Sequence, residues 1–131
     1  MPLKIGIILW FLIPTLAIAQ RKIIVGKSGK TDYTTVQAAL DAIPSGNTVP
    51  YTIYIKKGVY REEIVVDARK NFITFIGEDR DSTILTFNNH AGTRLPNGDT
   101  LNTWTCASTL IYGNNFRAEN ISFHNTAGYT A

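Results

Sequence analysis

The chain has 131 residues, with 13 Lys and Arg against 10 Asp and Glu, a formal net charge of +3 and a single cysteine. This length suits one ordinary domain rather than two, and a single cysteine excludes an intrachain disulfide. The basic residues are scattered, which argues against a nucleic-acid-binding surface, and the sequence lacks the His, Cys, Asp and Glu spacing of a zinc site or other metal site.

The N-terminus has the pattern of a secretory signal peptide. Lys4 precedes an apolar run over residues 5–13, and the small-residue triplet Ala17-Ile18-Ala19 leads into polar residues. A membrane-spanning helix is the alternative, but it needs about 20 apolar residues, and Pro14 interrupts this run. We therefore expect cleavage after Ala19, a secreted or periplasmic protein with no membrane attachment after cleavage, and one domain over residues 20–131.

The first elements predicted after this segment are a strand over residues 22–25, a turn over 26–29 and a helix over 33–42. In the helix, Val36, Leu40 and Ile43 recur at helical spacing, and Thr34 and Thr35 are candidate N-caps. Pro44 and the turn residues that follow it end the helix.

Short strands account for most of the remaining chain. Segments 72–75 and 120–123 share an Ile-(Thr/Ser)-Phe core at an offset of 48 residues, and half of this offset, about 24 residues, is the size of one coil in a parallel β-solenoid. An antiparallel β-sandwich has the same short strands and stays open as an alternative at this point. The predicted strands are 51–56, 64–67, 72–76, 83–87, 109–112 and 121–124, and the predicted core residues are Ile53, Ile55, Ile73, Phe75, Ile84, Ile111, Ile121 and Phe123.

Three blocks of sequence are more specific. Residues 32–44 read DYTTVQAALDAIP, residues 58–62 have the pattern G-x-Y-x-E, and residues 116–128 read FRAENISFHNTAG. In this order the blocks resemble those of the pectin methylesterase, or pectinesterase, family of carbohydrate esterases, and the last block, F-x-A-x-N-I-(T/S)-F-x-N-T-A-G in the family, is the most specific of the three.

The resemblance implies a fold and a function. The fold would be a right-handed single-stranded parallel β-helix of the pectin lyase-like type with a short capping helix, of which this chain would form the N-terminal part. Family members hydrolyse the methyl esters of galacturonate units in pectin to give pectate and methanol, and they need no metal or other cofactor. The implied partner is methyl-esterified pectin, in the modification or degradation of cell walls, and the full-length protein is expected to be a monomer.

The resemblance also locates the chemistry. In the family, an oxyanion-stabilising glutamine, two catalytic aspartates, an arginine and a tryptophan all follow the N-T-A-G block, so the catalytic residues are expected after Ala131 and the chain as it stands is expected to be inactive. Thr103 takes the place of a family threonine that contacts the sugar, and it is the single predicted substrate-binding residue. Trp104 beside it either presents an aromatic face or packs against the protein. The long polar loop over residues 88–102 is expected to line a cleft.

Other polar residues are interpreted as structural. We expect Glu62 to be a scaffold carboxylate, Asn120 and Asn125 to be amides that satisfy the backbone, and Cys106 to be a buried, inert thiol. We expect His124 to be solvated or packed, and Asp79 and Asp81 to belong to a charged turn rather than to an acid and base pair. The alternatives to an esterase are an inactive pectin-binding solenoid, a lyase or polygalacturonase of the same architecture, and a purely structural solenoid.

Overall fold

The computed structural model describes residues 20–127 together with Gly6, so the rest of the predicted signal peptide lies outside the described residues. The strands form three parallel sheets, named here A (β1, β2, β5 and β8), B (β3, β6 and β9) and C (β4 and β7). In chain order the elements are β1 (Arg21–Val25), α1 (Val36–Asp41), β2 (Tyr51–Ile55), β3 (Gly58–Arg61), β4 (Ile64–Val66), β5 (Ile73–Gly77), β6 (Thr83–Phe87), β7 (Thr109–Ile111), β8 (Arg117–Glu119) and β9 (Ser122–Asn125).

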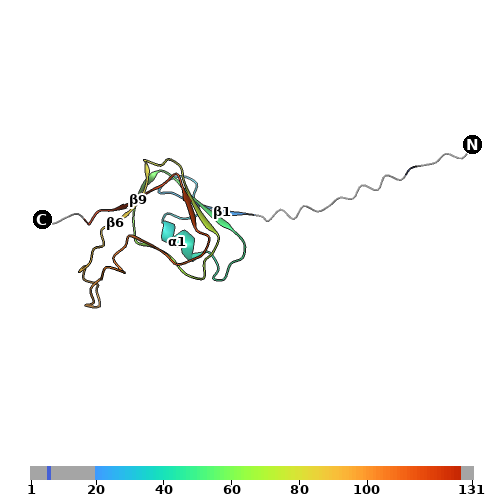
Figure 1. The fold of residues 1–131 in the computed structure, drawn as a ribbon. Helices are drawn as coiled ribbons and strands as arrows, with labels where there is room; N and C mark the ends of the chain where they lie inside the picture. The colour runs from blue at the N-terminus through green and yellow to red at the C-terminus, as the bar shows by residue number, and fades with distance from the viewer. Residues whose placement is uncertain (1–5, 7–19, 128–131) are drawn as a thin grey trace, which may run out of the picture.

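The chain passes from sheet A to sheet B to sheet C and back to sheet A, so it winds as a coil with three faces (Figure 1). All of the pairings between these strands are parallel, which confirms the predicted β-helix and excludes the antiparallel sandwich. None of the helices in the described part is long and apolar enough to cross a membrane.

Two strands, β3 and β8, were not predicted. Strand β3 contains the G-x-Y-x block, in which only Tyr60 is buried, and β8 consists of Arg117, Ala118 and Glu119. Neither strand has the run of apolar residues by which a strand is recognised in a sequence. Both are held in place by backbone pairing to a neighbouring coil, β3 to β6 and β8 to β5.

The predicted internal repeat is wrong. Segment 72–75 runs into β5 of sheet A, whereas segment 120–123 runs into β9 of sheet B, so the two do not occupy equivalent positions. The register gives the true coil lengths: Thr52 pairs with Thr74 after 22 residues, and Thr74 pairs with Arg117 after 43. The longer coil therefore contains 21 additional residues (43 minus 22), and these belong mainly to the loop between β6 and β7.

The core consists of inward side chains stacked from coil to coil. In sheet A, Ile53 and Phe75 stand in register and are fully buried, and in sheet B, Tyr60 and Leu85 do the same. Helix α1 buries Val36 and Leu40 and packs against β1, β2 and β4, so it closes the N-terminal end of the stack, where Figure 1 shows it inside the outline of the coil.

The predicted core residues divide into two groups. Ile53, Ile55, Ile73 and Phe75 are buried, and Ile121 packs against the core while partly exposed. Ile84 is only half-buried, because Leu85 is the inward residue of β6. Ile111 and Phe123 lie in register with the buried Val66 and Leu85, yet they are 41% and 40% exposed because they lie at the far end of the stack from α1.

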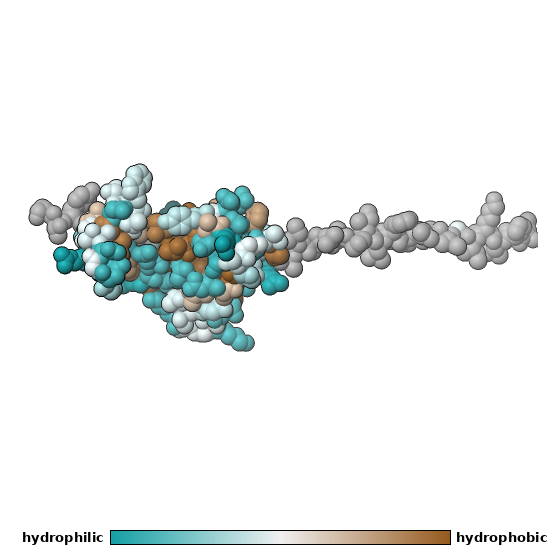
Figure 2. Space-filling model, turned by 90° about the horizontal axis from the view of Figure 1, so that it is seen from below, coloured by the Kyte–Doolittle hydropathy of each residue, from teal (hydrophilic) through white to brown (hydrophobic). Residues whose placement is uncertain are grey.

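Apolar residues also reach the surface. Figure 2 shows such residues gathered in the middle of one face, surrounded by hydrophilic ones. A hollow of about 390 Å³ is lined by Ile111, Phe116 and Phe123 at the end of the stack away from α1. The large apolar side chains that are exposed among the described residues are Val59, Phe72, Leu95, Trp104, Ile111, Tyr112 and Phe123.

Asparagine side chains connect one coil to the next at a turn before sheet A. The Asn47 amide group donates to the Asn71 carbonyl, and the Asn71 N–H donates to Asn47 Oδ1 at 2.9 Å. One coil further on, the Asn114 N–H donates to Asn71 Oδ1, also at 2.9 Å. The side chains of Asn47 and Asn71 thus each bond to backbone groups of the next coil.

Glu62 connects the G-x-Y-x-E block to the capping helix. Its carboxylate accepts from the N–H of Val36 at 3.2 Å and of Gln37 at 2.7 Å, and Thr35 Oγ1 accepts from the Ala38 N–H at 3.2 Å. These bonds satisfy three of the free N–H groups at the start of α1. The predicted structural role of Glu62 is confirmed, and the helix begins at Val36 rather than at residue 33.

Replacing Glu62 with alanine is expected to lower the free energy of unfolding by about 1–3 kcal/mol, because two helix N–H groups lose a charged acceptor. Urea denaturation followed by circular dichroism would measure the loss. Glu78→Ala is the matched control, since the exposed Glu78 carboxylate accepts a single bond from the Lys57 N–H. Equal losses in the two variants would contradict the capping role of Glu62.

Candidate functional site

The loop between β6 and β7, residues 88–108, is the largest irregular segment between two strands of the described chain. Figure 1 shows it projecting from the coil near the labels of β6 and β9. Its first half is a small hairpin: Arg94 and Thr100 form an antiparallel bridge, and the Leu95 N–H donates to the Asp99 carbonyl at 2.8 Å. The loop therefore has internal backbone structure that can hold a side chain at a fixed place.

Asn102 organises the turn that carries Thr103. Its Oδ1 accepts from the Trp104 N–H at 2.8 Å and from the Thr105 N–H at 3.1 Å, and its own N–H donates to Thr105 Oγ1 at 3.0 Å. An asparagine that bonds to the backbone two residues on is a common way to fix a turn. This organising residue was not predicted, although an asparagine within a loop is a recognisable signal for such a turn.

Thr103 and Trp104 both face solvent on this turn. Trp104 is 86% exposed, which resolves the two alternatives for this ring: it does not pack against the protein. A hydrophobic ring that stays exposed on a backbone held by side-chain hydrogen bonds can offer one face to a sugar ring.

A hollow of about 640 Å³ lies beside the turn. The loop contributes Leu95, Asp99, Leu101 and Thr105 to its walls, and Glu63 and Leu110 close it from the coil. Most residues that line this hollow belong to the loop, which confirms the prediction that the loop borders a cleft.

The asparagines of the last block have structural roles, as predicted. Asn120 donates from Nδ2 to the Gly77 carbonyl at 3.2 Å, and Asn125 donates to the Asn89 carbonyl at 2.9 Å. Asn125 Oδ1 also accepts from the Ala127 N–H at 3.0 Å. Both side chains therefore connect adjacent coils through hydrogen bonds to the backbone, which is a structural role.

Tyr60 of the G-x-Y-x-E block is structural as well. It is buried, and its hydroxyl donates to the Lys56 carbonyl at 2.7 Å. Burial raises the pKa of Tyr60, and the nearby charges of Glu62 and Glu78 raise it further. The phenol therefore stays protonated and serves as a hydrogen-bond donor inside the coil.

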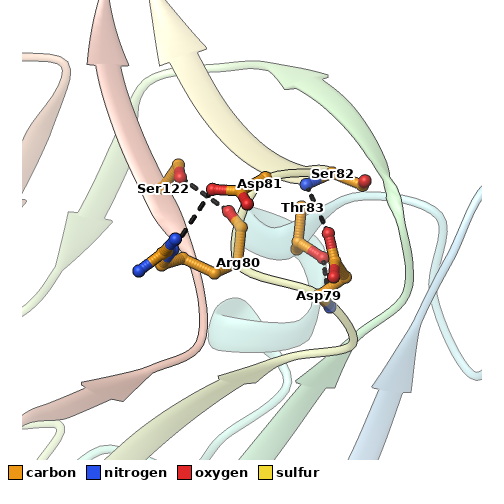
Figure 3. A network of polar contacts seen from close by, with 6 residues as sticks. All are labelled: Asp79, Arg80, Asp81, Ser82, Thr83 and Ser122. Atoms are coloured by element: carbon orange, nitrogen blue, oxygen red, sulfur yellow. Dashed lines mark hydrogen bonds and ion pairs between the residues drawn. The ribbon is translucent and has the colours of Figure 1, made fainter.

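The acidic residues between β5 and β6 form a turn, as predicted (Figure 3). Asp79 accepts from the Ser82 N–H at 2.9 Å, and the hydrogen bonds from Ser82 lower the pKa of the Asp79 carboxyl. Arg80 pairs with Asp81 at 3.1 Å, and both side chains are largely exposed. The two carboxylates have separate partners, so they do not form an acid and base pair.

Two other residues differ from or refine the expectations. Cys106 is half-buried rather than buried, with Sγ 3.7 Å from the Thr103 carbonyl oxygen, because it lies at the edge of the loop. His124 is exposed at the outer face of β9 rather than packed.

Within residues 20–127 and Gly6, the His, Cys, Asp and Glu side chains form no group of three that could hold a metal ion.

Comparison with known proteins identifies the family. A sequence model described as Pectinesterase matches residues 22–131. The chain belongs to the pectinesterase family. Pectinesterase 31 of Arabidopsis thaliana is 40% identical over 114 residues, which are 82% of this chain and 35% of that protein.

Solved pectinesterase structures have the same fold. Pectin methylesterase from carrot aligns with a TM-score of 0.69 and 38% identity over 84% of this chain and 33% of the carrot chain. A mutant pectin methylesterase in complex with a hexasaccharide aligns with a TM-score of 0.69 and 30% identity, over 76% of this chain and 29% of that chain. The right-handed parallel β-helix expected from the resemblance is thus confirmed, and the chain spans about a third of the length of these relatives.

Proposed function

We propose that this pectinesterase chain acts in the hydrolysis of methyl esters of galacturonate units in pectin, which yields pectate and methanol. The observation that carries the proposal is the match of residues 22–131 to the family. Because the chain spans about a third or less of the length of its relatives, the proposed activity is that of an enzyme of full family length. In that enzyme the described coils supply the start of the β-helix and the loop of residues 88–108.

The proposed chemistry needs groups that follow the N-T-A-G block in the family. One aspartate would attack the ester carbonyl as the nucleophile and a second would transfer the proton, so that hydrolysis proceeds in two steps. Amide donors would stabilise the oxyanion that develops on the carbonyl oxygen. The described coils would contribute binding rather than chemistry, with Thr103 as the substrate contact and Trp104 as the stacking partner.

The proposed setting is outside the cytoplasm. The pattern of residues 1–19 supports export with cleavage after Ala19, which would bring the enzyme to its polymer in the cell wall. N-terminal sequencing of the exported protein tests this part, and a first residue other than Gln20 would contradict it.

Methanol release from methylated pectin tests the activity. We expect it from the enzyme encoded by the gene that contains this sequence, and we expect its loss when the first aspartate after the N-T-A-G block is replaced by asparagine. Absence of methanol release by the unaltered enzyme would overturn the proposed function. Equal rates for the enzyme and the variant would overturn the proposed mechanism.

Trp104→Ala is expected to weaken the binding of a methyl-esterified oligogalacturonide about threefold to tenfold, because a stacked aromatic ring is worth about 0.5–1.5 kcal/mol. Titration calorimetry would measure the dissociation constant. Tyr112→Ala is the matched control, since Tyr112 is also an exposed aromatic residue but lies outside the loop. A loss that is no larger for Trp104→Ala than for Tyr112→Ala would argue against a substrate contact at this turn.

A further inference from the structure

The hollow of about 640 Å³ beside the Thr103 turn lies between the loop of residues 88–108 and the outer face of sheet C. Leu110 of β7 points outward, because its neighbour Ile111 pairs with the buried Val66 and so takes the inward position. The loop adds two more leucines to the walls. We refer to this space as the sheet C hollow, and its walls are Glu63, Leu95, Asp99, Leu101, Thr105 and Leu110.

The sheet C hollow contains negative charge without a cation. Glu63 and Asp99 both line it, and none of the side chains that line it is basic. The ion pairs formed within residues 20–127 lie elsewhere, so neither carboxylate of the hollow belongs to one. The hollow therefore presents strong hydrogen-bond acceptors and no group that would attract an anion.

Glu63 is an acceptor held in a fixed place. Its Oε2 accepts from Asn89 Nδ2 at 2.6 Å, and Asn89 is itself only 5% exposed. The Asn89 carbonyl in turn accepts from Asn125 Nδ2 at 2.9 Å, which ties this contact to the next coil. Glu63 Oε1 accepts no hydrogen bond from the described part of the chain. A carboxylate held in this way can bind a donor at little cost in side-chain entropy.

Asp99 is held by the hairpin of the loop. Its carbonyl accepts from the Leu95 N–H at 2.8 Å, and its Oδ2 accepts from Asn97 Nδ2 at 2.9 Å. The leucines of the hollow supply apolar surface beside both carboxylates. Apolar walls with a few fixed polar groups, in a space of about 300–1,000 Å³, are typical of sites for small molecules.

A neutral sugar matches these groups better than a uronic acid does. Each hydroxyl of a neutral hexose can donate to a carboxylate, and the C–H groups of its ring can pack against leucine. A galacturonate unit would bring a third negative charge next to Glu63 and Asp99, and like charges brought together without a cation oppose binding. A methyl-esterified unit avoids this charge, but its ester group has acceptors only, where a neutral hexose has a hydroxymethyl donor.

We propose that the sheet C hollow binds a neutral hexose unit of the polysaccharide, one that carries a hydroxymethyl group in place of the carboxyl group of galacturonate. The proposal rests on the proposed function, which makes pectin the polymer that reaches this loop. Hydroxyls of the hexose donate to Glu63 Oε1 and to the Asp99 carboxylate, and the ring lies against Leu110. The backbone units contact Thr103 and Trp104 on the same loop, so the enzyme holds the polymer beside a neutral branch.

Binding of a neutral oligosaccharide to the enzyme encoded by the gene that contains this sequence tests the proposal. Calorimetric titration with β-1,4-galactotetraose is expected to show saturable binding. Glu63→Gln is expected to raise the dissociation constant about fivefold or more, because hydrogen bonds to a charged acceptor are worth more than those to a neutral one. Glutamine keeps an oxygen that can accept from Asn89, so this variant is expected to fold. Glu78→Gln is the control, since the exposed Glu78 lies outside the hollow, and it is expected to leave the dissociation constant within about twofold.

Asp99→Asn gives a second readout on a different element. It is expected to raise the dissociation constant about threefold, because the charge of one acceptor is lost from the exposed hairpin. An excess of tetragalacturonate is expected not to displace galactotetraose, and displacement would overturn the proposal. Putrescine tests a cationic ligand: putrescine binding that is lost in Glu63→Gln, with no binding of galactotetraose, would assign the hollow to cations and overturn the proposal.

The inference can fail while the proposed function stands. No binding of galactotetraose, or equal effects of Glu63→Gln and Glu78→Gln, would overturn the inference. Methanol release from methylated pectin by the unaltered enzyme reports the proposed function separately, so the two failures are distinguishable.

Discussion

Phe75→Ala is expected to remove about 3–5 kcal/mol from the free energy of unfolding, the usual loss for a large aromatic side chain in a core. Phe75 is fully buried in the second strand from the edge of sheet A, in register with Ile53 on one side and Ala118 on the other. Its ring meets the ring of Phe116 edge to face, with centroids 4.9 Å apart. The small Ala118 cannot fill the space that Phe75 would vacate, so a cavity would remain.

Urea denaturation measures this loss as a lower midpoint with an unchanged slope. A domain of this size is typically stable by about 5–15 kcal/mol, so the variant would keep only a fraction of its stability. Phe75→Leu is expected to cost about 1.5 kcal/mol or less, since most of the volume is kept, and the exposed Tyr112→Ala about 0.5 kcal/mol or less. Similar losses for Phe75→Ala and Tyr112→Ala would contradict the stacked core.

The fold presents the proposed carbohydrate contacts on a loop held by a regular scaffold. The loop of residues 88–108 leaves the coil at the end of β6, the middle strand of sheet B. The parallel ladder holds the base of the loop, and the turn fixed by Asn102 holds Thr103 and Trp104. A regular scaffold commonly presents functional loops in this way.

Much of this fold could be predicted from the sequence because local signals agree with it. Thr35 and the spacing of Val36 and Leu40 indicate the helix, and the β-branched residues of segment 51–55 indicate a strand. The motif blocks add the order of the coils through the family resemblance. The structural roles of Glu62 and Asn125 were also predicted, and both side chains bond to backbone groups, although Glu62 is only half-buried and Asn125 is exposed.

The register between coils could not be predicted in the same way. Phe75 opposes Ala118, not Phe123, because the insertion of residues 88–108 lengthens one coil and shifts every later residue against a fixed repeat. No local pattern reports such a shift, since it depends on which backbone groups pair across coils.

Gly113→Ala and Gly77→Ala are each expected to lower the free energy of unfolding by about 3 kcal/mol or more, at the upper end of overpacking effects. A Cβ at Gly113 would lie 1.9 Å from the Lys70 carbonyl oxygen, and a Cβ at Gly77 would lie 2.1 Å from the Asn120 carbonyl oxygen. Backbone atoms of a neighbouring coil cannot move aside as the end of a flexible side chain can. Neither glycine has a positive φ. Glycine is therefore needed at these two positions because neighbouring coils approach closely, and not because a turn demands a left-handed backbone.

Gly46→Ala tests the other reason for a glycine, a left-handed backbone conformation, separately from the close approach of coils. Gly46 has a φ of +75° and nothing within 4 Å of an added Cβ, so alanine there is strained but does not collide with another coil. We expect this variant to lose only about 1–2 kcal/mol, the cost of a left-handed conformation for a residue with a side chain. Denaturation midpoints of the three variants make the comparison. Losses at Gly113 and Gly77 no larger than about 1–2 kcal/mol, and so no larger than the loss at Gly46, would mean that the coils can move apart to accept a methyl group. The coils that position the loop of residues 88–108 would then be stacked more loosely than the backbone distances indicate.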